Sequence, residues 1–122
     1  MQHREIVLQP EPASVRRARE FAHASLAEAG CTDDGAIDIV ISELVTNAIV
    51  HGAAPITLHL WPRPGHVRVG VSDGSAAQLE PRNATASARS GRGLAIVERL
   101  AVQWGSDSRH DGKLAWADVA CT

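Results

Sequence analysis

The hydrophobic positions of the chain follow a helical repeat most clearly between Ile37 and Gly52, where the sequence reads IDIVISELVTNAIVHG. At about 100° per residue, its apolar side chains fall on one broad face of a helix. Three polar residues, spaced four apart, follow one another along the margin of that face. The apolar positions are Ile37, Val40, Ile41, Leu44, Val45 and Ala48, and the polar positions are Glu43, Asn47 and His51.

Two further stretches have helical spacing, and five have the alternation of strands. One helix is predicted from Ser14, a suitable N-cap, to Gly30, and a short one opens at Gly93. The predicted order is strand, two helices, two strands, helix and two strands. We therefore expect an α/β fold, a two-layer sandwich of one mixed five-stranded sheet with three helices on one face. The predicted strands are residues 4–9, 56–61, 66–71, 102–108 and 114–120.

Residues 76–92 have no apolar periodicity and are rich in Ala, Ser, Arg and Pro. Loops of this length within compact domains are uncommon unless they are lids, binding loops or disordered segments. The segment is therefore a candidate lid.

Composition narrows the class of protein. The chain has 122 residues, of which 44% are hydrophobic and 21% charged, which favours one domain over residues 1–122. A net charge of −2 argues against a nucleic-acid partner.

Cys31 and Cys121 have no paired spacing, so neither a zinc site nor a disulfide framework is predicted. Without a signal peptide or a membrane-length apolar run, we expect a cytoplasmic protein without a membrane partner.

Two pairs of residues are candidates for chemistry. Glu43 and Asn47 lie one turn apart, so the amide could bind Mg²⁺ while the carboxylate takes a proton, although such residues on a helix margin are often only solvated. Asp73 and Gly74 follow a predicted strand. Asp73 could accept a hydrogen bond from an adenine amine and Gly74 could let the base approach, but Asp-Gly is most often only a β-turn.

A glycine-containing segment joins the candidate lid to the third helix. Its backbone N–H groups and the helix dipole could bind phosphate oxygens, with two arginines adding charge-assisted contacts. The alternative is a polar loop with solvated arginines. The residues proposed for phosphate binding are Arg89, Gly91, Arg92, Gly93 and Leu94.

Three sequence segments occur in the order ELVTNAIVHG, DGS and GRGLAIV, with strands and the candidate lid between them. The combination resembles the GHKL (histidine-kinase-like) nucleotide-binding family, and within it the small bacterial anti-sigma-factor serine/threonine kinase type. The resemblance covers nearly the whole chain, as far as the closing WGSDSRHDGKLAWADV.

This resemblance implies a Bergerat-type fold that holds ATP between the long helix, the helix after the lid and the sheet. It also implies a role for each matching residue. Asn47 would bind Mg²⁺ bridging the phosphates, and Glu43 would be the base that activates the attacking hydroxyl. Asp73 would bind the adenine amine, and Gly91 and Gly93 would form the hinge of the lid.

Two positions depart from the family pattern. Ser75, Ala76 and Ala77 follow Gly74 where a second glycine is usual, and Leu114 occupies a position where related domains often carry a threonine that holds adenine. Lys113 is predicted to be a solvated turn residue. The tryptophans are predicted to pack at strand positions.

The resemblance favours an ATP-dependent protein serine/threonine kinase. It would phosphorylate an anti-anti-sigma-type protein and sequester a sigma factor, and it would form a homodimer. The first alternative is a non-catalytic switch that binds ATP or a partner protein without phosphate transfer. A second is an interaction module that binds no nucleotide.

Overall fold

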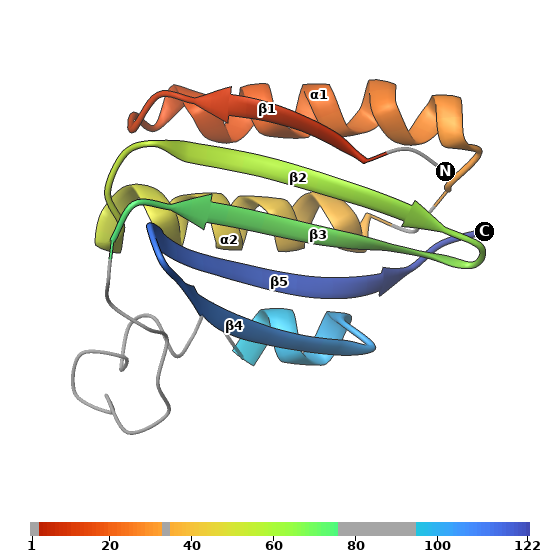
Figure 1. Ribbon diagram of the computed structural model, residues 1–122. Coiled ribbons are helices and arrows are strands. Elements are labelled where there is room, and N and C mark those ends of the chain that lie inside the picture. Colours follow the sequence, from red (N-terminus) through yellow and green to blue (C-terminus); the bar gives the residue numbers. More distant parts are fainter. Residues whose placement is uncertain (1–2, 33–34, 76–94) are drawn as a thin grey trace.

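The protein is described here by a computed structural model that covers residues 3–32, 35–75 and 95–122. Five strands form one sheet in the order β1-β2-β3-β5-β4 (Figure 1). The strands are β1 (Arg4–Leu8), β2 (Ile56–Arg63), β3 (His66–Asp73), β4 (Gln103–Arg109) and β5 (Gly112–Ala120), and the helices with full bounds are α1 (Ala13–Ala29) and α2 (Ala36–His51). Residues 95–100 form a further helical segment.

Every pair of neighbouring strands is antiparallel, which corrects the expectation of a mixed sheet. The connection from β3 crosses to the far edge of the sheet, where β4 begins. β5 then returns by a hairpin and occupies the place between β3 and β4. β3 and β4 therefore run parallel but do not touch, so the crossover leaves no parallel pairing.

The helices cover one face of the sheet, and no helix or strand of the described residues covers the other, which is called the open face below (Figure 1). α1 packs on β1 and β2, while α2 packs on β2, β3 and β5. The alternation predicted for the strands holds, because Leu58, Leu60, Val69 and Val71 point into the layer between helices and sheet and are buried. The predicted apolar face of the long helix is buried there too. This burial of apolar surface is the main stabilising contribution to the two-layer fold.

The start of α1 differs slightly from the prediction. The helix begins at Ala13, with Pro12 as its N-cap residue and no side-chain capping bond. The Ser14 hydroxyl instead donates a 2.6 Å hydrogen bond to the carbonyl oxygen of Gln9 and is buried. Ser14 therefore links α1 to the end of β1 and does not cap the helix.

A disulfide bond joins Cys31 to Cys121, so the prediction that the cysteines would not pair was wrong. Their Cα atoms lie 5.4 Å apart, although 90 positions separate them in sequence. Thr32 and Thr122 exchange two backbone hydrogen bonds of 2.7 Å beside the disulfide. The disulfide and these hydrogen bonds thus join the segment after α1 to the segment after β5. The spacing of two cysteines in a sequence cannot predict that these segments are close in space.

Within the described ranges, none of the helices combines the length and the apolar character needed to cross a membrane.

Candidate functional site

α2 presents the two polar residues that the helical pattern singled out. Glu43 and Asn47 are both partly exposed, whereas the adjacent Leu44 and Ala48 are buried in the core. The boundary between the buried and the solvated face of α2 therefore runs along these two side chains. Because they lie one turn apart, a carboxylate and an amide are available at the same margin of one helix.

Asp73 ends β3 on the face that the helices cover. It is one of the few charged side chains buried among the described residues. Its Oδ1 atom accepts a 2.7 Å hydrogen bond from the backbone N–H of Ser75, and the N–H of Gly74 donates to the carbonyl oxygen of Ala53 at 2.7 Å. Asp73 and Gly74 thus form a turn that is hydrogen-bonded to the segment after α2. The carboxylate is held in one place before any ligand arrives.

Gly52 allows the end of α2 to lie directly against Asp73. A Cβ atom at position 52 would come within 2.7 Å of the Asp73 carboxyl group and 2.6 Å of the carbonyl oxygen of Ala48. Any side chain here would push the helix end and the carboxylate apart. The sequence prediction used Gly52 only as a helix terminator, whereas the structure makes it the contact between the helix that carries Asn47 and the strand that carries Asp73.

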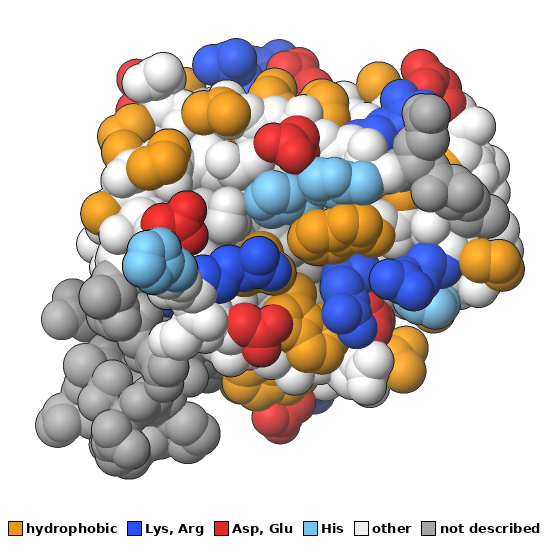
Figure 2. Space-filling model, in the orientation of Figure 1, with side chains coloured by type: hydrophobic (Ala, Val, Ile, Leu, Met, Phe, Trp, Pro, Cys, Tyr) orange, Lys and Arg blue, Asp and Glu red, His pale blue; other side chains and the backbone are white. Residues whose placement is uncertain are grey.

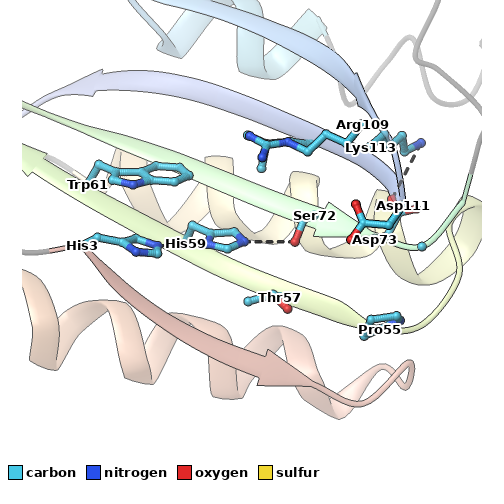
Figure 3. A pocket seen from close by; sticks show the side chains of 12 residues that line it. His3, Pro55, Thr57, His59, Trp61, Ser72, Asp73, Arg109, Asp111 and Lys113 are labelled. Atoms are coloured by element: carbon cyan, nitrogen blue, oxygen red, sulfur yellow. Dashed lines mark hydrogen bonds and ion pairs between the residues drawn. The ribbon is translucent and has the colours of Figure 1, made fainter.

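Lys113 lies opposite Asp73 in the pairing of β3 with β5. Its Nζ atom is 3.9 Å from the Oδ2 atom of Asp73 (Figure 3), and the Lys113 side chain is only 4% exposed. The expectation of a solvated turn residue was therefore wrong. The side chain points into the layer between helices and sheet because paired residues in a sheet point to the same face.

Leu114 is on the opposite face of the sheet. A Cβ atom added at Gly70 would lie 3.1 Å from the Cδ1 atom of Leu114 and 2.8 Å from the ring of Trp61. Leu114 and Trp61 thus both lie on the open face. Leu114 therefore covers Gly70 beside Trp61, as the side-chain alternation along β5 requires. At this end of the strand, the residue on the same face as Asp73 is Lys113.

The remaining predicted site residues, Arg89, Gly91, Arg92, Gly93 and Leu94, lie outside the described residues. The same holds for the candidate lid, residues 76–92. Their assignment to phosphate binding stays a prediction.

A groove of about 390 Å³ crosses the open face of the sheet and reaches Asp73 and Lys113 at its end (Figure 3). His59 and Trp61 line it from β2, and Arg109 lines it from the end of β4. Burial holds the pKa of His59 below its usual value, although the nearby Glu5 carboxylate opposes this shift. The groove was not predicted, although the alternation of His59 and Trp61 with buried leucines placed both side chains on this face.

An ion pair lies farther along the same face. Arg68 donates two hydrogen bonds, of 2.7 and 3.0 Å, to the carboxylate of Asp118, and Gln103 donates a third, of 2.7 Å. The guanidinium lies 4.0 Å from the ring centroid of Trp116. The hydrogen bonds from Arg68 and Gln103 hold the pKa of Asp118 below its usual value, against the opposing effect of burial. Figure 2 shows the histidine, arginine and apolar side chains together on this face.

Known proteins resemble this chain over most of its length. The family described as histidine kinase-like ATPase domain matches residues 8–117. An uncharacterized protein of Streptomyces coelicolor, SCO4941, is 38% identical over 85 residues, which are 66% of this chain and 81% of that protein. The crystal structure of the RsbU and RsbW domains of Rv1364c from Mycobacterium tuberculosis matches 99% of this chain with a TM-score of 0.73 and 25% identity. This chain spans 32% of that one.

Proposed function

Because the chain belongs to the histidine kinase-like ATPase domain family, we propose that residues 1–122 form one ATP-binding regulatory domain of the anti-sigma-factor type, with serine/threonine kinase activity. Its substrate would be an anti-anti-sigma-type protein, and its sequestered target a sigma factor. One observation carries the proposal. The helix with Glu43 and Asn47 ends against the buried carboxylate of Asp73, with only Gly52 between them.

The residues present fit a nucleotide. The Asp73 carboxylate is fixed at a strand end and can accept a hydrogen bond from an exocyclic amine, while Gly74 leaves room for a flat base beside the backbone. Asn47 has an amide oxygen suited to Mg²⁺, which when bound neutralises phosphate charge. In this proposal Arg89, Gly91, Arg92, Gly93 and Leu94 hold the phosphates.

Glu43 supplies the base in the proposed reaction. The serine hydroxyl of the partner protein loses its proton to the Glu43 carboxylate as its oxygen bonds to the γ-phosphorus of ATP. The bond from that phosphorus to the oxygen bridging the β and γ phosphates breaks, and ADP leaves with the electron pair. A positioned base of this kind contributes roughly 10²–10⁴-fold in rate.

The test combines binding and phosphate transfer. Wild type and Glu43→Gln are incubated with γ-labelled ATP, Mg²⁺ and candidate serine-bearing partners, and ATP affinity is measured by calorimetry. Glu43→Gln keeps the shape and hydrogen bonding of the side chain, so it should bind ATP within a few-fold of wild type and lose nearly all transfer. Glu98→Gln, an exposed position on the segment 95–100, is the matched control. Undiminished transfer by Glu43→Gln would remove Glu43 as the base.

Mg·ATP should also stabilise the fold. A ligand at 100 times its dissociation constant adds about 2.7 kcal/mol to the free energy of unfolding. Asn47→Ala should abolish most of the part that depends on Mg²⁺. Identical melting of wild type with and without saturating Mg·ATP would overturn the nucleotide proposal.

A non-catalytic switch is the second candidate, and the position of Lys113 favours it. Its buried ammonium group, 3.9 Å from Asp73, competes with an adenine amine for that carboxylate, which favours regulation through a partner protein over turnover of ATP. The switch would bind ATP or a partner without transferring phosphate, so ATP affinity without transfer to any partner would distinguish it from the kinase.

Homodimer formation and a cytoplasmic location also belong to the proposal. The location follows because a domain that sequesters a sigma factor must be in the same compartment as that factor. Sedimentation and cell fractionation test these two points. Disulfide bonds are rare in the cytosol, so the state of Cys31 and Cys121 in the cell bears directly on the location.

A further inference from the structure

Three side chains with metal-binding atoms meet on the open face of the sheet, away from α2. Glu5 pairs with His59 across β1 and β2, and His3 precedes Glu5 by two positions, so all three point to the same face. Their ligand atoms all lie within 4.8 Å of one another. The Nε2 atom of His3 is 3.0 Å from Nδ1 of His59 and 3.8 Å from Oε1 of Glu5.

We propose that His3, Glu5 and His59 form a binding site for a divalent transition-metal ion of the zinc class. Imidazole nitrogen and carboxylate oxygen suit Zn²⁺, whose bonds to them are about 2.0–2.2 Å long. Two ligands of a tetrahedral ion at that distance are roughly 3.3 Å apart, close to the 3.0 Å between the two histidine nitrogens. Glu5 is an exposed side chain, so it can move the remaining distance. Three protein ligands leave one position open.

Neighbouring side chains orient the two imidazole rings. The Nε2 atom of His59 is 3.0 Å from the hydroxyl oxygen of Ser72 on β3 (Figure 3). This bond occupies one nitrogen and leaves Nδ1 directed at His3. A hydrogen bond on the second nitrogen is the usual support of a metal-binding histidine.

The ring of Trp61 adds a second constraint. It stacks on His59 with a centroid distance of 5.2 Å and on His3 with one of 4.9 Å. The interplanar angles are 7° and 11°. The two imidazoles are therefore held nearly parallel to one indole before any ion binds, which lowers the entropy lost on binding.

The site is separate from the proposed nucleotide site, because its ligands point away from the face that α2 covers. Without a metal, an N–H group of one imidazole donates a hydrogen bond to the nitrogen of the other across the 3.0 Å contact. A divalent ion would replace that proton. The cluster borders the groove that Arg109 and Lys113 also line, so the open coordination position is accessible to water or to a small anion.

The experiment titrates Zn²⁺ into the chain, without an affinity tag, by calorimetry. Substitution by Co²⁺ then reports the ligand field through its visible absorption. Wild type should bind one ion per chain. His59→Gln, His3→Gln and Glu5→Gln should each weaken binding at least tenfold, and Ser72→Ala should weaken it by roughly 10- to 100-fold. His66→Gln, on the same face but outside the cluster, should bind like wild type.

His3 and Glu5 are exposed, so their variants keep the proposal testable even if His59→Gln fails to fold. Absence of Zn²⁺ binding by wild type would overturn the proposal. So would binding that persists unchanged in Glu5→Gln and His59→Gln, since the ion would then sit elsewhere. The titrations are run without ATP, whose phosphates bind Zn²⁺ themselves, so their outcome does not depend on the proposed nucleotide site.

Discussion

The Nζ atom of Lys113 lies 3.9 Å from the Oδ2 atom of Asp73, and the two side chains are only 4% and 2% exposed. Lys113 is the only lysine in the chain. Two opposite charges are thus buried together at the end of β3, where the Asp73 carboxylate also accepts the N–H of Ser75. Removing one charge leaves the other without its counterion in a place that water reaches poorly.

Lys113→Met should therefore destabilise the fold. We expect a loss of about 1–3 kcal/mol in the free energy of unfolding, below the value for a hydrogen-bonded buried pair because the contact is longer than a hydrogen bond. Urea denaturation measures the loss. The double variant Asp73→Asn with Lys113→Met should recover part of it, because no buried charge remains. Additive losses in the double variant would show that the pair is not coupled.

Gly52→Ala should weaken nucleotide binding by displacing Asp73. The backbone at Gly52, with φ of −97°, is accessible to alanine, so the effect comes from the 2.7 Å approach of the new Cβ atom to the carboxyl group. We expect ATP affinity to fall at least tenfold. Gly35→Ala is the control, because φ there is 100° and no atom lies within 4 Å. It should cost about 1 kcal/mol of stability and leave ATP affinity unchanged.

Breaking the disulfide bond should lower the melting temperature. A cross-link that spans 90 positions restricts the unfolded chain, and the typical contribution is about 2–4 kcal/mol. Thermal melting with and without reductant measures it. Cys31→Ser, Cys121→Ser and the double variant should lose the same amount and should no longer respond to reductant. A wild-type protein that melts identically under both conditions would contradict the bond.

The pair of Arg68 and Asp118 should contribute stability that disappears in acid. The pKa of Asp118 is lower in the folded protein than its unfolded value of about 3.9. Its contribution is therefore complete above the unfolded pKa and is lost as the pH falls through the folded one. Arg68→Met should lower stability near neutrality and flatten its fall below about pH 4. Urea denaturation over a pH series measures both effects.

The control for that series is Arg16→Met. Arg16 pairs with Glu20 at 3.6 Å, but both side chains are well exposed, at 79% and 64%. Solvent screens such a pair, so its removal should change stability by less than about 0.5 kcal/mol at any pH. If the free energy of unfolding falls equally steeply below about pH 4 in wild type and in Arg68→Met, other carboxylates govern acid unfolding.

The sequence by itself determined the elements and their faces. Helical spacing from Ile37 to Ala48 predicted the buried face of α2, and it placed Glu43 and Asn47 on the margin of that face. Alternation predicted the strands, the open face and the position of Asp73 at the end of β3. These properties are local, because the period of a helix or strand decides which side chains share a face.

Only the tertiary structure decided which distant residues meet. The insertion of β5 between β3 and β4 set the register that buries Lys113 beside Asp73, and a shift of one residue would have turned Lys113 to the open face. The approach of Cys31 to Cys121 and of His3 to His59 likewise depends on which segments, distant in the sequence, the order of the strands brings side by side. No periodicity encodes such contacts, because they follow from pairing across the sheet and not from spacing along the chain.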